Sequence, residues 1–269
     1  SGRQIVFVHG FGSCTYSWRK NLEPLAAKGF RTYAIDVKGF GLTAKPKDGQ
    51  YHLAAFTDHL LAFLDAKKIE RPILVGNSMG GAVIARLALL HPDRVAGIVL
   101  VDAAPPDLAL KPRGIAVGGV ATPPAPILSL GATFATALAR ALVTRGLVER
   151  GLRTAYHDPK FLTREEVEIQ LRPMAIDGAA EALAALTASP AGPIVPNPPL
   201  SGLKPPALIV WGRHDRIIPV GMADYFTREL PEARKVIFEK SGHMPHVEEA
   251  DAFNALLLEF VDSTAPNPR

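Results

Sequence analysis

The sequence predicts an α/β protein built on a doubly wound, mostly parallel sheet. Short apolar runs alternate with helix-forming segments over the first hundred or so residues, and the alternation resumes near residue 207. Such alternation is typical of parallel strands joined by helical crossovers. The interruption at residues 103–204 is rich in proline and alanine, and it predicts a helical cap inserted between two parts of one core, residues 1–102 and 205–269.

The first part of the core alternates element by element. Runs of apolar residues predict buried strands at residues 4–8, 31–35, 73–75 and 96–101. Helices are expected near residues 18–28 and at residues 53–67 and 82–90. The helix at 53–67 carries leucine and phenylalanine at helical spacing, which predicts one apolar face against the sheet. Pro92 ends the third helix, because proline cannot continue it.

The insertion predicts helices of its own, at residues 127–144, 147–156, 163–171 and 178–186. The third of these opens with Thr163 and Glu166 at the spacing of a capping box. Beyond the insertion the alternation returns, with strands expected at residues 207–211 and 234–238 and helices at residues 220–230 and 251–261. One large α/β core with an insertion therefore accounts for the chain.

Residues 76–81, Gly-Asn-Ser-Met-Gly-Gly, lie directly between an expected strand and an expected helix. Gly76 and Gly80 flank Ser78 in a G-x-S-x-G pattern, and glycines let the strand and the helix approach closely while the serine hydroxyl is exposed at the apex. The helix N-terminus points its free N–H groups at this position, which favours an anion developing there. The pattern predicts a nucleophilic serine.

A serine hydroxyl needs a general base, and the base needs a group that orients it. His243 follows the strand expected at 234–238, and Asp215 follows the strand expected at 207–211. Both therefore fall at carboxyl ends of parallel strands, on the edge that carries Ser78. Asp102 ends another strand on the same edge and is the rival for the acid.

The order Ser78, Asp215, His243, with the serine elbow and the His9-Gly10 loop, resembles the α/β-hydrolase superfamily over nearly the whole chain. The resemblance implies the α/β-hydrolase fold, with Ser78 as nucleophile, His243 as general base and acid, and Asp215 as the carboxylate that fixes the histidine tautomer. Members of the family usually carry two further strands before the His-Gly strand. We therefore expect either a sheet of about six strands or a truncated chain.

The same resemblance places the oxyanion hole at the backbone N–H groups of Phe11 and Met79. It favours Asp215 over Asp102, because Asp215 follows the strand that the family usually employs. His9 is then expected to hold its own loop rather than to react.

A serine nucleophile directs the reaction to an acyl carbon, because the resulting ester can be cleaved by water, whereas an ether formed at an alkyl carbon cannot. We expect a carboxylesterase or lactonase that acts on a small apolar acyl substrate through an acyl-enzyme. One alternative is a carbon–carbon hydrolase of ring meta-cleavage products, because residues 76–81 resemble the serine elbow of that group. That group usually has tryptophan where this chain has Met244. The other alternative is a ligand receptor on a hydrolase scaffold, with slow turnover.

Composition argues against several other classes. The single Cys14 excludes an internal disulfide, and no cluster shows zinc-ligand spacing, so neither a metal nor a cofactor is expected. The formal net charge is +4, but Lys and Arg are scattered, so nucleic acid binding is not predicted. The chain enters a strand-like run at Ile5 without a leader, which predicts a soluble, cytoplasmic protein. The oligomeric state stays open.

Residues 114–139 contain no charged side chain. Pro123, Pro124 and Pro126 break this stretch, and the apolar run after them is shorter than the roughly twenty residues that cross a bilayer. No membrane span is therefore expected. We expect the insertion to form a lid over Ser78 and part of this stretch to border an apolar acyl pocket.

Overall fold

A six-stranded parallel sheet forms the centre of the computed structural model, which describes residues 2–106, 145–188 and 199–264. The strands run in the order β2-β1-β3-β4-β5-β6, and every neighbouring pair is parallel. Their bounds are β1 Gln4–Val8, β2 Arg31–Ile35, β3 Ile73–Asn77, β4 Gly97–Val101, β5 Ala207–Gly212 and β6 Arg234–Phe238. The structure confirms the expected fold class.

The strand order reverses beside β1, because β2 lies on one side of it and β3 on the other. In open α/β sheets a crevice forms at such a reversal, outside the carboxyl ends of the strands. The loop after β1 and the serine elbow after β3 therefore open into the same space.

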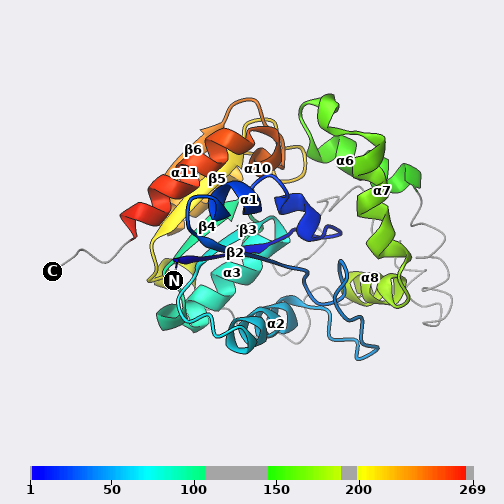
Figure 1. Cartoon of the computed structure of the whole chain (residues 1–269), viewed down its shortest axis with the longest axis horizontal. Helices are drawn as coiled ribbons and strands as arrows, with labels where there is room; N and C mark the ends of the chain where they lie inside the picture. The colour runs from blue at the N-terminus through cyan, green and yellow to red at the C-terminus, as the bar shows by residue number, and fades with distance from the viewer. Residues whose placement is uncertain (1, 107–144, 189–198, 265–269) are drawn as a thin grey trace.

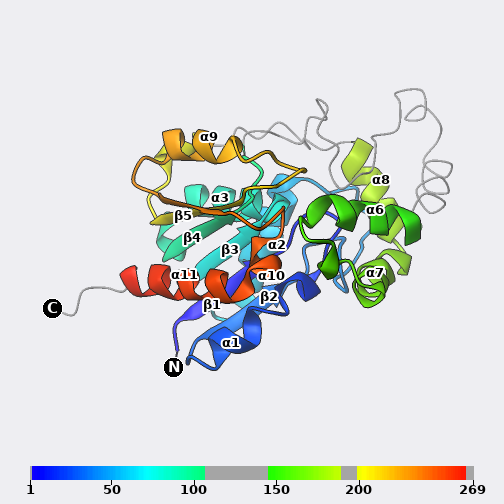
Figure 2. The ribbon, with the colours of Figure 1, turned by 90° about the horizontal axis from the view of Figure 1, so that it is seen from above.

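Helices cover both faces of the sheet (Figure 2). Two of them pack against one face, α1 Leu22–Ala26 and α11 Ala250–Ser263. Three pack against the other, α2 Leu53–Ala66, α3 Met79–Leu90 and α9 Met222–Glu229. The central strands β1, β3 and β4 are buried on both faces, which explains why they are continuous apolar runs rather than alternating ones.

Three further helices lie together at one end of the sheet (Figures 1 and 2): α6 Arg145–Ala155, α7 Arg164–Leu171 and α8 Ala179–Ala188. We call them the cap helices. They match three of the four helices expected in the insertion. The fourth, at residues 127–144, and the charge-free stretch at residues 114–139 lie outside the described residues. The boundaries of the insertion at 103 and 204 stay a prediction.

Two local expectations need correction. The helix expected near residues 18–28 is split into a 3₁₀ helix, Thr15–Trp18, and the short α1, because Asn21 between them turns its amide to the carbonyl of His246 and to Asn254. The short helix α10, Pro245–Glu248, was not expected. Both corrections fall beside the loop that carries His243.

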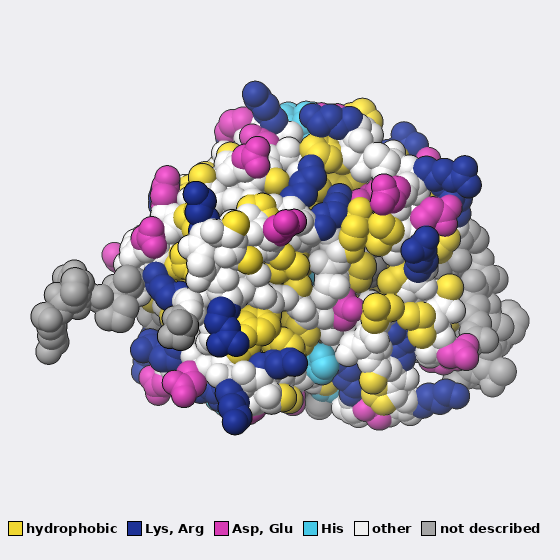
Figure 3. Space-filling view, in the orientation of Figure 1, with side chains coloured by type: hydrophobic (Ala, Val, Ile, Leu, Met, Phe, Trp, Pro, Cys, Tyr) yellow, Lys and Arg dark blue, Asp and Glu magenta, His cyan; other side chains and the backbone are white. Residues whose placement is uncertain are grey.

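One face of the molecule mixes charges of both signs. Figure 3 shows Lys and Arg side chains interspersed with Asp and Glu over one face of the molecule, so this face carries no continuous basic patch for nucleic acid. Among the described residues, no helix combines the length and the apolar character needed to cross a bilayer.

Candidate active site

Ser78 occupies a sharp turn between β3 and α3, at φ 54° and ψ −120°. A positive φ is rare for a residue with a side chain, and such strain is concentrated at functional sites. Glycine is required around it, since a Cβ on Gly76 would overlap the Gly80 carbonyl and a Cβ on Gly80 would overlap the Val8 carbonyl. The expected exposed hydroxyl needs correction: Ser78 is only 7% exposed, and it lines a cavity rather than the outer surface.

His243 and Asp215 are joined by a hydrogen bond of 2.7 Å between Nδ1 and Oδ2. The other oxygen of Asp215 accepts the N–H groups of Ile217 at 2.7 Å and Ile218 at 3.0 Å. Burial favours the neutral acid, but the charge and hydrogen bond of His243 and the two N–H donors outweigh it, so the pKa of Asp215 is lowered. An ionised Asp215 keeps the proton of His243 on Nδ1 and leaves Nε2 free to accept one.

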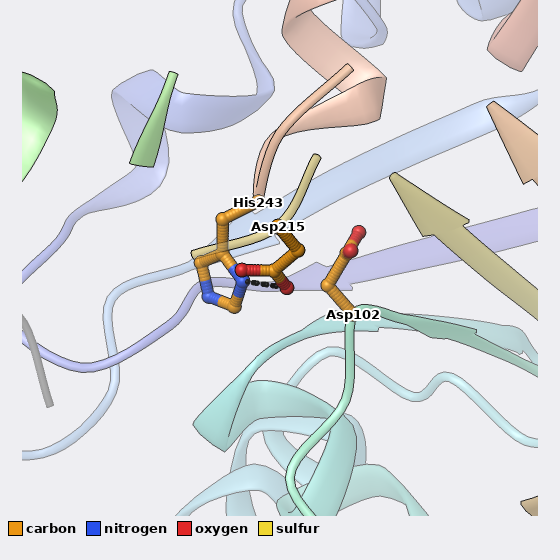
Figure 4. Close-up of side chains that lie close together, drawn as sticks. All are labelled: Asp102, Asp215 and His243. Atoms are coloured by element: carbon orange, nitrogen blue, oxygen red, sulfur yellow. Dashed lines mark hydrogen bonds and ion pairs between the residues drawn. The ribbon is translucent and has the colours of Figure 1, made fainter. Parts of the chain in front are cut away.

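The side chain of Asp102 lies beside Asp215 and His243 but is not bonded to the histidine (Figure 4). Its Oδ1 accepts the Gly212 N–H at 2.9 Å, and within the described part of the chain its Oδ2 has no hydrogen-bond partner. Burial, followed by the charge of Asp215, raises the pKa of Asp102 well above the ordinary carboxyl range. The acid bonded to His243 is thus Asp215 and not its rival.

The same three side chains are also the one group of His, Cys, Asp and Glu in the described ranges that could hold a metal, with ligand atoms within 4.8 Å of one another. The hydrogen bond between His243 and Asp215 already engages the atoms that face each other. The closeness of His243 to Asp215 is therefore explained by this hydrogen bond, without a metal ion between them.

The cavity at Ser78 has a volume of about 150 Å³. Core and cap both line it: the core contributes Phe11, Phe40, Asn77, Ser78, His243 and Met244, and the cap helices contribute Leu147, Val148, Leu152, Gln170 and Leu183. Of the two residues expected to form the oxyanion hole, Phe11 lines the cavity, and Met79 is the first residue of α3, immediately after Ser78. The Gly81 N–H, in the first turn of this helix, donates to the Ser78 carbonyl at 2.9 Å, and the oxyanion hole at Phe11 and Met79 stays a prediction.

The two loops beside the cavity are held by His9 and Asp36. Nε2 of His9 accepts the Val37 N–H at 3.0 Å while Nδ1 donates to the Gly10 carbonyl at 2.7 Å, so the ring is neutral, and burial lowers its pKa. Asp36 accepts the N–H groups of Thr15 at 2.7 Å and Leu42 at 2.8 Å. The histidine is structural, as expected, and Asp36 joins two separate loops.

Several contacts that hold the His243 loop were missed from sequence. The Asn77 side chain donates to the His243 carbonyl at 3.1 Å, and the His243 N–H donates to the carbonyl of Ala155 in α6 at 2.7 Å. Glu248 accepts the N–H groups of Gly242 and of His157 in the insertion, each at 2.7 Å. Asn77 lies inside the elbow motif and could have been suspected; the other contacts join segments far apart in sequence and leave no local signal.

An ion pair with a buried carboxylate also joins cap and core. Thr163 caps α7 through the Glu166 N–H, as expected, but the Glu166 carboxylate turns away and pairs with Arg19 of the core at 2.7 Å. It also accepts the Tyr156 hydroxyl at 2.8 Å. Close by, burial raises the pKa of the Cys14 thiol to about 11, which keeps it protonated and unreactive near neutral pH.

A family model described as the alpha/beta hydrolase fold matches residues 4–250. The chain belongs to this family and is a hydrolase of α/β fold. A 2-hydroxymuconate semialdehyde hydrolase from Pseudomonas sp. (strain CF600) is 30% identical to it over 267 residues, covering 97% of this chain and 87% of that protein.

Two solved structures are similar. A meta-cleavage product hydrolase from Pseudomonas fluorescens has a TM-score of 0.80 at 23% identity, covering 98% of this chain and 92% of that one, which shows the shared fold. An N-acyl homoserine lactone degrading enzyme has a TM-score of 0.73 at 27% identity, covering 97% of this chain and 93% of the other.

Proposed function

We propose that the protein hydrolyses carboxylic esters or lactones through an acyl-enzyme formed on Ser78. The observation that carries the proposal is the placement of Ser78 at a strained elbow, in the wall of a cavity that His243 also lines, with His243 bonded to an ionised Asp215. This arrangement supplies a nucleophile, a base and a carboxylate in three different strand-end loops.

The proposed reaction has two halves. Nε2 of His243 takes the hydroxyl proton as Ser78 Oγ bonds to the acyl carbon, and the proton then passes to the departing alkoxide. Water attacks the ester formed on Ser78 while His243 removes a proton from the water, and His243 then returns that proton to Ser78 Oγ as the carboxylic acid leaves. The N–H groups of Phe11 and Met79 are proposed to stabilise the oxyanion in both halves.

The cavity supports a neutral, apolar acyl group of modest size. No Lys, Arg, Asp or Glu is among its described lining residues, and its volume is about 150 Å³. An engineered apolar cavity of about this volume binds benzene. An acyl chain of about six carbons is therefore the proposed preference.

The second candidate is a carbon–carbon bond hydrolase, and the relative named as a 2-hydroxymuconate semialdehyde hydrolase favours it. A muconate carries a carboxylate, and a buried carboxylate is stabilised most by a hydrogen bond from a cationic side chain. The described cavity wall offers none. Met244, in the position after His243, adds an apolar surface there.

One panel of substrates tests these proposals. The protein should be assayed with p-nitrophenyl esters, N-acyl homoserine lactones and 2-hydroxymuconate semialdehyde, each beside Ser78→Ala. Repeated turnover of an ester or lactone that is lost in Ser78→Ala supports the proposal. A higher kcat/KM for the semialdehyde would select the carbon–carbon hydrolase. Reaction once per molecule, without cycling, would indicate a ligand receptor on this scaffold.

A further inference from the structure

Asp102 is a fully buried acid that the proposed reaction does not use. It follows β4 at φ 45°, a conformation that costs of order 1–3 kcal/mol for a residue other than glycine. Its backbone N–H donates to the Val210 carbonyl and its Oδ1 accepts the Gly212 N–H, each at 2.9 Å. Its Oδ2 is buried and, in the described structure, receives no hydrogen bond. A carboxylate would leave this oxygen unsatisfied.

Asp215 lies at the adjacent strand end, and Figure 4 shows its carboxyl between Asp102 and the His243 ring. The two acids and the ring nitrogen lie within 4.8 Å of one another. Asp215 accepts from three donors, namely His243 and the N–H groups of Ile217 and Ile218, whereas Asp102 accepts from one. Two ionised carboxylates at such a separation away from water are strongly disfavoured, so one proton is retained by the acid with fewer donors.

We propose that Asp102 is the protonated member of a carboxyl pair and that its Oδ2 hydroxyl donates a hydrogen bond to the ionised Asp215. Asp102 is then a positioning residue, which acts through Asp215 on His243. Its role in turnover rests on the proposed function, but its protonation does not. The hydrogen bond supplies the missing partner of Oδ2 and fixes the Asp215 carboxylate from the side opposite His243.

The surrounding charges agree with this assignment. Burial and the charge of Asp215 raise the pKa of Asp102, and Glu248 raises it further. The ring N–H that faces the pair is Nδ1 of His243, and it donates to Asp215 rather than to Asp102. The proton of the pair therefore belongs on Asp102.

Infrared spectroscopy tests the protonation without any need for activity. Protein with ¹³C-labelled aspartate carboxyl groups should show the C=O absorption of a protonated acid at pH 8, and Asp102→Asn should remove it. Asparagine suits the site, because it tolerates positive φ, its Oδ1 can accept from Gly212 and its Nδ2 can donate to Asp215. Absence of such a band from the wild-type spectrum at pH 8 would overturn the proposal.

The pH–rate profile tests the positioning role. Asp102→Ala should lower kcat by about 10- to 100-fold, the effect of losing a hydrogen bond to a charged group, and should move the midpoint of the profile to higher pH, because Asp215 becomes more basic. Asp102→Asn should recover most of this loss and keep the wild-type midpoint. A lower midpoint in Asp102→Asn than in the wild type would mean that the substitution had removed a negative charge, which contradicts the proposal. A protein that cleaves no ester but shows the infrared band would sink the proposed function alone.

Discussion

The backbone N–H of His243 donates a hydrogen bond to the carbonyl oxygen of Ala155 over 2.7 Å. Ala155 is the last residue of α6, and the last carbonyls of a helix have no partner within the helix. The loop of the proposed base therefore supplies the hydrogen-bond donor for a carbonyl at the end of a cap helix. His243 is held by Asp215 of the core on its side chain and by the cap on its backbone, so the position of the cap and the geometry of the base are coupled.

Gly242→Ala should disturb this coupling. A Cβ at residue 242 would overlap the Ala155 carbonyl and would meet the His157 nitrogen at 2.8 Å, and both obstacles are backbone atoms that cannot rotate away. We expect a loss of about 1–3 kcal/mol in the free energy of unfolding, as for other overpacked sites, and a fall in kcat from the displaced His243. Urea unfolding and ester turnover measure the two effects.

Gly221→Ala is the matched control. Nothing lies within 4 Å of its Cβ position, and its φ of −59° suits alanine. This change should leave turnover intact and alter the free energy of unfolding by no more than about 1 kcal/mol, because the gain from a stiffer unfolded chain opposes the loss of a favoured N-cap residue. If Gly242→Ala behaved like Gly221→Ala, the close approach of the cap to the histidine loop would not exist in solution.

Ser78→Ala should abolish ester turnover, with a loss of up to about a millionfold in kcat where a nucleophile is removed. The fold should persist, because the substitution removes one hydroxyl at a cavity wall and leaves the backbone unchanged. A fluorophosphonate probe should label the wild-type protein at Ser78 alone. Efficient labelling of Ser78→Ala would assign the nucleophile to another residue.

Asp215→Asn should lower kcat by about ten-thousandfold, because an asparagine amide favours the wrong tautomer of His243. Asp102→Asn should be mild by comparison, since asparagine reproduces both hydrogen bonds proposed for Asp102. Steady-state kinetics on one p-nitrophenyl ester compare the two variants directly. A reversed ranking would exchange the roles of the two acids.

The strands could be predicted almost residue for residue because each contains a short apolar run between turn signals. β1, β2 and β6 have the expected bounds. The elbow could be predicted for a similar reason: the glycines at 76 and 80 and the strain at Ser78 are local properties of one strand-to-helix turn. The topology then brings Asp215 and His243 together at the carboxyl edge of the sheet.

The contacts that tune the site could not be predicted. Sequence spacing placed Asp102 and Asp215 on one edge, but their unequal numbers of hydrogen-bond donors depend on how the loops after β4 and β5 close. The Ala155 contact involves a backbone carbonyl, which carries no residue-type signal. The pairing of Glu166 with Arg19 replaced half of an expected capping box, because a tertiary partner competed for the same carboxylate.

The stability of Asp102→Asn relative to wild type should rise with pH. The raised pKa of Asp102 means that the folded protein holds a proton that the unfolded chain releases above about pH 4. The contribution of Asp102 to the free energy of unfolding of the wild type is therefore fully present below about pH 4. It is lost as pH rises toward the pKa of Asp102 in the folded protein, by up to about 1.4 kcal/mol per pH unit. Asparagine does not titrate. Urea unfolding between about pH 4.5 and 8 gives the difference, and a constant difference would mean that folded Asp102 ionises normally.

The acyl preference should follow the size of the cavity. Each methylene added from acetate toward hexanoate should improve kcat/KM by up to about 0.8 kcal/mol, or about fourfold, because more apolar surface leaves water. The gain should stop near six carbons, since a cavity of about 150 Å³ suits a group the size of benzene. Initial rates on p-nitrophenyl esters from acetate to octanoate measure the series.

Leu183→Ala tests whether α8 sets this limit, because Leu183 lines the cavity. Its removal should move the best chain length upward by about one to three carbons, in proportion to the methylenes removed. Leu90→Ala is the control for the same substitution, since Leu90 is 41% exposed at the end of α3 and does not line the cavity. It should leave the preference unchanged. A series that is flat from acetate to octanoate in the wild type would show that the acyl chain does not enter this cavity, and the cap would then select substrates by some other contact.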